Sequence, residues 1–134
     1  MTKKFVVVAI AQGEARIWKT GLEPHTHPET VQAPIEDVFH HFRSARFHRG
    51  HDSDHLDPIY FESISDVLGT AEEILLVGHG KGKANSMLRL TQYLERKHPD
   101  QAKMVVDALD TDLENLSEGE ILALAREWRA SHSS

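Results

Sequence analysis

Three segments of the chain are nearly continuous runs of apolar residues, and they predict the strands of a buried sheet. The runs cover residues 5–11, 73–77 and 103–109. Apolar runs of this length, rich in β-branched residues, are typical of strands that are covered on both faces. Residues 14–19 alternate instead, directly after the turn Gln12-Gly13, and predict an opening β-hairpin. We expect a further edge strand over residues 30–33, in a stretch that holds three of the five prolines.

Apolar residues with helical spacing predict three helices. The first begins with Asp57 as N-cap and Pro58 in its first turn, and Gly69 ends it. The second runs from about Ala84 to His98 and stops at Pro99. The third follows the capping box Ser117-Glu118-Gly119-Glu120. Their predicted inner faces are Tyr60, Phe61, Ile64, Val67 and Leu68; Ala84, Met87, Leu88, Thr91 and Leu94; and Ile121, Leu124, Ala125 and Trp128.

The order of these elements predicts a single α/β domain over residues 1–134. Strands that alternate with helices indicate parallel strands joined by crossover helices, so we expect a mixed sheet with an N-terminal β-hairpin and parallel βαβ units. A chain of 134 residues fits one core. We expect residues 1–3 and 130–134 to be flexible, and residues 40–57 to form a long Arg- and His-rich loop.

Composition and charge exclude several classes of protein. The chain has no cysteine, which excludes disulfides, thiolate nucleophiles and cysteine-bound metals. Its formal charge of -6 argues against binding nucleic acid through the whole surface, so any such contact must be local. The first apolar run is too short to span a membrane. We therefore expect a cytoplasmic protein with no membrane contact.

The segment Gly78-His79-Gly80-Lys81-Gly82-Lys83 is a candidate anion site, because it joins a predicted strand to a helix N-terminus. Lys81 and Lys83 would add positive charge there. The phosphate-loop motif needs four residues between its first glycine and the Gly-Lys pair, followed by Ser or Thr. Here three residues stand between Gly78 and Gly82, and Ala84 replaces the hydroxyl. The segment therefore favours a plain strand-to-helix turn over a nucleoside triphosphate site.

The stronger candidate for RNA contact is the stretch of residues 40–51, which contains no acid until Asp52. It combines arginines and histidines with two phenylalanines, and the residues that we predict to contact RNA are Arg43, Arg46, His48 and Arg49. Guanidinium groups suit phosphate oxygens, and aromatic rings stack on unpaired bases. The alternative is a solvated polar loop whose phenylalanines dock on the body of the domain.

A further cluster, which consists of His48, His51, Asp52, Asp54 and His55, offers ligands for a metal ion but matches no known metal spacing. Asp107, Asp110 and Asp112 could form a carboxylate cluster at a strand end, where α/β proteins place ligands. Such residues more often form turns or carry solvated charge beside a helix. We predict no metal and no cofactor. His25 and His27, which lie between prolines, are expected to be exposed loop residues.

Several of these segments resemble the second half of the middle domain of archaeal and eukaryotic class 1 release factors and of the Pelota family. They are Glu73-Ile74-Leu75-Leu76-Val77-Gly78-His79-Gly80, Lys103-Met104-Val105-Val106-Asp107 and Glu120-Ile121-Leu122-Ala123-Leu124-Ala125. Val7-Val8-Ala9-Ile10 and Glu14-Ala15-Arg16-Ile17 are similar to the start of small bacterial relatives of the translational-machinery or host-attachment type. The resemblance implies a ribonuclease-H-like sheet with flanking helices and a place near the ribosome.

In the release factors a Gly-Gly-Gln loop hydrolyses peptidyl-tRNA, and this sequence contains no such tripeptide. The resemblance therefore favours a non-catalytic, translation-related protein that binds the ribosome or tRNA through its Arg- and His-rich loop. One alternative is a small hydrolase or metal-dependent enzyme that uses the same loop. A second alternative is a homodimeric protein-interaction module.

Overall fold

The computed structural model describes residues 4–11, 13–33, 52–79 and 86–132, with residues 52–57 described by their backbone alone. Five strands form one sheet in the order β3-β2-β1-β4-β5. The strands are β1 (Phe5–Ile10), β2 (Glu14–Trp18), β3 (Glu29–Gln32), β4 (Glu73–Gly78) and β5 (Val105–Asp110). β2 pairs antiparallel with β1 and β3, whereas β4 pairs parallel with β1 and β5. The predicted hairpin and parallel βαβ units, in a ribonuclease-H-like mixed sheet, are thus confirmed.

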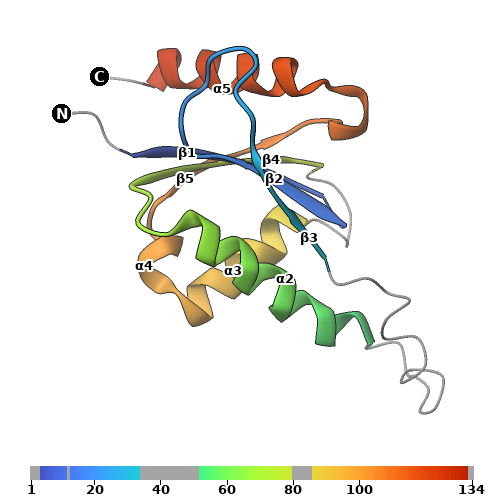
Figure 1. The fold of residues 1–134 in the computed structure, drawn as a ribbon. Coiled ribbons are helices and arrows are strands. Elements are labelled where there is room, and N and C mark those ends of the chain that lie inside the picture. The colour runs from blue at the N-terminus through green and yellow to red at the C-terminus, as the bar shows by residue number, and fades with distance from the viewer. Residues whose placement is uncertain (1–3, 12, 34–51, 80–85, 133–134) are drawn as a thin grey trace.

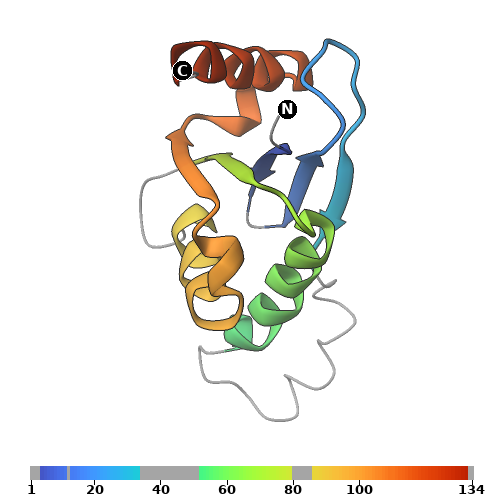
Figure 2. The same ribbon diagram turned by 90° about the vertical axis from the view of Figure 1, so that its left-hand side faces the viewer.

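The helices cover both faces of this sheet. α2 (Asp52–Leu68), α3 (Ser86–Lys97) and α4 (Pro99–Ala102) lie on one face, and α5 (Glu118–His132) lies on the other (Figures 1 and 2). A short 3-10 helix, η1 (Leu113–Asn115), joins β5 to α5. Within the described part of the chain, no helix is long and apolar enough to cross a membrane.

The sheet separates two hydrophobic cores, which explains why the first apolar run is continuous. Successive side chains of a strand point to opposite faces. Val6, Val8 and Ile10 therefore pack toward α2 and α3, while Val7 and Ala9 pack toward α5. All six residues of β1 are buried, as predicted for a strand that is covered on both faces.

The first predicted helix begins earlier in the structure than its sequence signals indicate. α2 begins at Asp52, and Pro58 lies inside it, so the prediction of Asp57 as N-cap is wrong. The apolar periodicity starts only at Tyr60, and the polar turns before it therefore give no amphipathic signal. Residues 52–57 belong to this helix, whereas residues 40–51 lie outside the described part of the chain. Gly69 ends α2 as predicted, with a φ of 57°.

The third predicted strand is an edge strand, not a strand that is buried on both faces. Its side chains alternate between half-buried and exposed positions, and Val106 is among the exposed ones. Asp107 Oδ1 accepts a hydrogen bond from the Ala108 N–H at 2.8 Å, and Asp107 Oδ2 accepts one from Trp128 Nε1 at 2.7 Å. Among the described strands, β5 pairs with β4 alone and so lies at the edge of the sheet, and Val106, Ala108 and Asp110 are exposed.

The helix faces differ from the predicted ones at particular positions. On α3, Leu90 and Tyr93 are buried, whereas Leu88 is 53% exposed. On α5, Leu122 is buried and Leu124 is half-buried. α3 packs against both the sheet and α2. Its buried surface therefore includes Tyr93, whose ring lies against Phe61 of α2.

α5 continues to His132 and so includes part of the C-terminal segment that was predicted to be flexible. The His132 ring stacks on Trp128 with 4.2 Å between centroids, and His132 Nδ1 lies 2.8 Å from the Trp128 carbonyl oxygen. The predicted capping box is present: Ser117 Oγ accepts from the Glu120 N–H, and Glu120 Oε1 accepts from the Ser117 N–H. Residues 1–3 and 133–134 lie outside the described residues.

Candidate functional site

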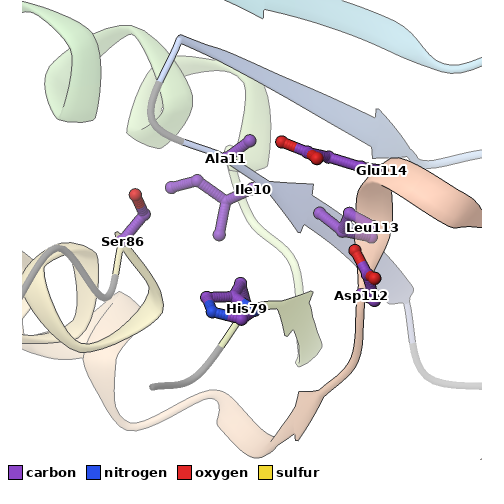
Figure 3. Close-up of a pocket in the computed structure, with 7 residues that line it drawn as sticks. All are labelled: Ile10, Ala11, His79, Ser86, Asp112, Leu113 and Glu114. Carbon is purple, nitrogen blue, oxygen red and sulfur yellow. The ribbon is translucent and has the colours of Figure 1, made fainter. Parts of the chain in front are cut away.

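A hollow of about 490 Å³ lies at the edge of the sheet where the parallel strands β1, β4 and β5 end (Figure 3). Open α/β sheets usually bind their ligands outside the carboxyl ends of the strands. The described residues that line the hollow are Ile10, Ala11, His79, Ser86, Asp112, Leu113 and Glu114. Figure 3 shows Ser86 on one side of the hollow and the segment from Asp112 to Glu114 on the other.

Gly78 brings the end of β4 close to its neighbours. A Cβ atom at this position would lie 2.8 Å from the Ile10 carbonyl oxygen and 3.1 Å from Met87 Cγ. The Gly78 carbonyl accepts a hydrogen bond from the Thr111 N–H at 2.7 Å, which joins the end of β4 to the segment after β5. The first glycine of the predicted loop therefore serves close packing of β1, β4 and α3.

One wall of the hollow carries two carboxylates, which the 3-10 helix η1 presents. Asp112 precedes η1, and its Oδ2 accepts a hydrogen bond from Asn115 Nδ2 at 2.6 Å. Leu113 is buried between Asp112 and Glu114, both of which are exposed. Alternation of polar and apolar residues in this turn directs the acids to the hollow and the leucine to the core.

The opposite wall carries His79, which directly follows β4, and Ser86, the first residue of α3. His79 is exposed, whereas the exposed fraction of Ser86 is only 9%. The Ser86 hydroxyl makes no hydrogen bond in the described part of the structure. Sequence reasoning missed Ser86 and Glu114 as lining residues, because only the pairing of the strands brings their segments together.

Every residue of the predicted RNA or phosphate site, Arg43, Arg46, His48, Arg49, Lys81 and Lys83, lies outside the described residues. The structure does describe the residues that flank these segments. Ala33 and α2 flank the first segment, and His79 and Ser86 flank the second. The Ala33 N–H donates to the Gly13 carbonyl in the β1–β2 turn, and Tyr60 Oη of α2 donates to the Ala11 carbonyl at the end of β1. The described residues that precede both segments, Ala33 and His79, thus lie at the carboxyl edge of the sheet.

The Tyr60 hydrogen bond is well protected from ionisation. Burial raises the pKa of Tyr60 far above its usual value, and the negative charge of Glu14 raises it further. The phenol therefore stays protonated and keeps donating to Ala11 at ordinary pH.

The candidate metal ligands lie only partly in the described part of the chain. No group of three or more metal-binding side chains occurs among the described residues. His51 lies outside them, and for Asp52, Asp54 and His55 only the backbone is described. Of the three predicted carboxylates near β5, Asp112 lines the hollow, whereas Asp107 binds the Trp128 indole.

A second polar cluster, which the sequence did not indicate, ties α2, α3 and α4 together. Glu62 Oε1 accepts a hydrogen bond from Tyr93 Oη at 2.6 Å and lies 2.7 Å from His98 Nε2. The hydrogen bond from Tyr93 is the largest cause that lowers the pKa of Glu62, and the hydrogen bond from His98 is the second. The pKa of Tyr93 is raised to about 12. Burial is the largest cause, and the hydrogen bond to Glu62 is the second.

A second hollow, of about 440 Å³, lies between the β2–β3 connection and the start of α5. Its described lining includes His25, His27 and Glu118. His25 and His27 are exposed, as predicted, and His25 has a φ of 72°. The connection is held to the body of the domain because Trp18 Nε1 donates to the Thr26 carbonyl and Arg126 Nη1 donates to the Leu22 carbonyl.

Comparison with known proteins gives a likeness of fold alone. No family model matches the chain, and no curated protein matches it by sequence. The chain is similar to the crystal structure of Archaeoglobus fulgidus Pelota, with a TM-score of 0.50 and 13% sequence identity. The similarity covers 98% of this chain and 37% of the Pelota chain. The described domain therefore has a Pelota-like fold, and it spans little more than a third of that protein.

Proposed function

We propose that this chain is a translation-related protein that binds the ribosome or tRNA without catalysing peptidyl-tRNA hydrolysis. The observation that carries this proposal is the likeness to Pelota over 98% of the chain. The proposed RNA contacts are Arg43, Arg46, His48 and Arg49, with Lys81 and Lys83 on a phosphate.

The anchoring of the two basic segments supports this proposal. Ala33, which precedes residues 34–51, and His79 and Ser86, which flank residues 80–85, are described residues that lie at the carboxyl edge of the sheet. Arginine and lysine in neighbouring connections supply the local positive charge that a chain with a formal charge of -6 needs for contact with phosphates.

The non-catalytic part of the proposal rests on the sequence. Gly-Gly-Gln, the tripeptide with which the release factors act, is absent from all 134 residues. A serine nucleophile needs a hydrogen bond to a general base. Ser86 of the described hollow has no hydrogen-bond partner among the described residues, so it does not form such a pair with the carboxylates.

Sedimentation of the tagged protein through sucrose gradients at low salt tests the proposal. We expect the protein in ribosomal fractions, and we expect the triple variant Arg43→Ala, Arg46→Ala, Arg49→Ala to leave them. A matched control with the same change in charge is Arg96→Ala, Lys97→Ala, Lys103→Ala, because these residues are exposed at the opposite end of α3 and before β5. Absence of the unmodified protein from ribosomal fractions, with and without stress, contradicts the proposal.

A further inference from the structure

We propose that Asp107 keeps the edge strand β5 from pairing with β5 of a second copy of this chain. Its carboxylate covers the backbone N–H group through which such a pairing would form. The inference concerns contact between copies of the chain, so it goes beyond the proposed function and does not depend on it.

β5 has the properties of a strand that could take a further neighbour. Among the described strands it pairs with β4 alone, and it lies at the edge of the sheet as the orange strand in Figure 2. Its exposed side chains include Val106, which is 39% exposed, and Ala108. The backbone groups on the open side of an edge strand are a template for pairing with another chain. An unprotected edge of this kind would favour the association of two copies.

The N–H group of Ala108 points to the open side of β5. The Thr111 N–H donates to the Gly78 carbonyl at 2.7 Å, so Thr111 directs its N–H group toward β4. The N–H groups of successive residues in a strand point alternately to its two sides. Leu109 therefore shares the direction of Thr111, whereas Ala108 points away from β4. A second strand along β5 would form a hydrogen bond with Ala108.

The carboxylate of Asp107 occupies the place of that second strand. Its Oδ1 accepts a hydrogen bond from the Ala108 N–H at 2.8 Å, and its Oδ2 accepts one from Trp128 Nε1 at 2.7 Å. Trp128 stacks on the rings of Phe5 and His132, at centroid distances of 6.0 and 4.2 Å. α5 therefore holds the carboxylate in place, and a second strand would reach the Ala108 N–H only by breaking its bond to Asp107.

The charge of Asp107 disfavours a second copy in particular. Antiparallel pairing of two β5 strands about a two-fold axis would place two Asp107 and two Asp110 carboxylates along one shared edge. Like charges on neighbouring strands are destabilising. Apart from Asp107, residues 105–109 are all apolar, which is typical of segments that associate through strand pairing. Asp107 is thus the one charge that interrupts this run.

Sedimentation equilibrium of the full chain over a range of protein concentrations tests the proposal. The variant Asp107→Thr removes the carboxylate and introduces a residue that suits a strand. We expect its average mass to rise from that of one chain toward twice that value, more steeply with concentration than the mass of the unmodified protein. Asp107→Asn, which keeps the shape of the side chain, should show a smaller rise, because the amide lacks the charge and one of the two acceptor oxygens.

Two further variants separate the covered N–H group from other effects of losing Asp107. Trp128→Phe removes the indole N–H but leaves Asp107 beside Ala108, and it should keep the mass of the unmodified protein. Adding Ala108→Pro to Asp107→Thr removes the N–H group itself, and proline is tolerated on an edge strand where the N–H group faces solvent. This double variant should return to the mass of the unmodified protein. Far-UV circular dichroism of each variant confirms that it is folded.

Three results would overturn the proposal. The first is the same dependence of mass on concentration in Asp107→Thr and the unmodified protein, with Asp107→Asn taking its place if the threonine variant does not fold. The second is an equal rise in Trp128→Phe, which would indicate that loosening of α5, and not the uncovered edge, causes the association. The third is continued association of the double variant, which would place the contact on another surface.

Discussion

Two buried serines differ in whether their hydroxyl groups are hydrogen-bonded. Ser65 Oγ donates to Gln101 Oε1 at 2.5 Å, whereas Ser86 has no partner in the described structure. A buried hydrogen bond contributes about 1 kcal/mol, and an unsatisfied hydroxyl contributes nothing favourable. Ser65→Ala should therefore lower the free energy of unfolding by about 1 kcal/mol, while Ser86→Ala should leave it unchanged or raise it slightly.

Urea denaturation of the two variants beside the unmodified protein measures this difference. Each variant serves as the control of the other, since both remove one buried hydroxyl from the end of a helix that packs on the same core. Ser65 lies in the last turn of α2, and Ser86 is the first residue of α3. Equal losses of stability would show that Ser86 has a partner in solution.

Gly78 is the described glycine at which an added Cβ atom would make the closest contact. The new Cβ of Gly78→Ala would lie 2.8 Å from the backbone oxygen of Ile10, which cannot move without shifting β1. Overpacking of this kind typically costs about 1 to 3 kcal/mol. Gly119→Ala is the matched control, because its Cβ would meet only Ser117 Oγ at 3.9 Å and alanine favours a helix. Thermal unfolding should show a loss for the first variant alone; a loss of the same size for both would contradict this account.

Single residues were predictable where local chemistry alone determines their role. Gly69 ends α2, and Ser117 and Glu120 cap α5, because a positive φ and a capping box leave signals within a few residues. Ser86 and Glu114 were not predictable, since their burial and their common hollow depend on how distant strands pair.

At the level of elements, the cluster of Glu62, Tyr93 and His98 makes the packing of α2, α3 and α4 depend on pH. The pKa of Glu62 is lowered in the folded protein, from an ordinary value of 4.5. Its contribution to stability is therefore complete above about pH 4.5 and is lost as the pH falls through the lowered value. Between pH 6 and pH 3 the unmodified protein should lose more stability than Glu62→Gln.

At alkaline pH, the contribution of Tyr93 in the same cluster to stability changes with pH in the opposite direction. The pKa of Tyr93 is raised from 10.0 to about 12, so its contribution is complete below pH 10 and is lost as the pH rises toward 12. Urea midpoints across both pH ranges, with Glu95→Gln as an exposed control on α3, measure these changes. Identical acid-range slopes for Glu62→Gln and the unmodified protein would contradict the role of this cluster.

Elements were predictable where hydrophobic periodicity marks them. β1, β2 and β4 were located closely, whereas the start of α2 and the edge position of β5 were not. The first turns of α2 carry few apolar residues, so no periodic signal marks them. An apolar sequence such as that of β5 does not reveal whether a strand has one neighbour or two, because that depends on the order of strands in the sheet.

At the scale of the whole molecule, acidic side chains lie at the edge of the sheet where the proposed RNA contacts are attached. Asp112 and Glu114 line the hollow at this edge together with His79 and Ser86, which flank residues 80–85. Neutralising the two acids should therefore strengthen any binding to ribosomes, because it removes charges that repel phosphates. The fold of the whole chain was predicted from sequence resemblance and is confirmed as Pelota-like, but likeness of fold does not transfer an activity.

The salt dependence of binding to purified ribosomes or tRNA tests the central claim most directly. Each arginine that neutralises a phosphate contributes about 0.7 to 0.9 to the slope of log affinity against log salt concentration. The account predicts measurable binding by the unmodified chain, and a slope that is smaller by about 2 to 3 in the Arg43→Ala, Arg46→Ala, Arg49→Ala variant. Binding with the same affinity and the same slope in both proteins, or no binding by either, would contradict it.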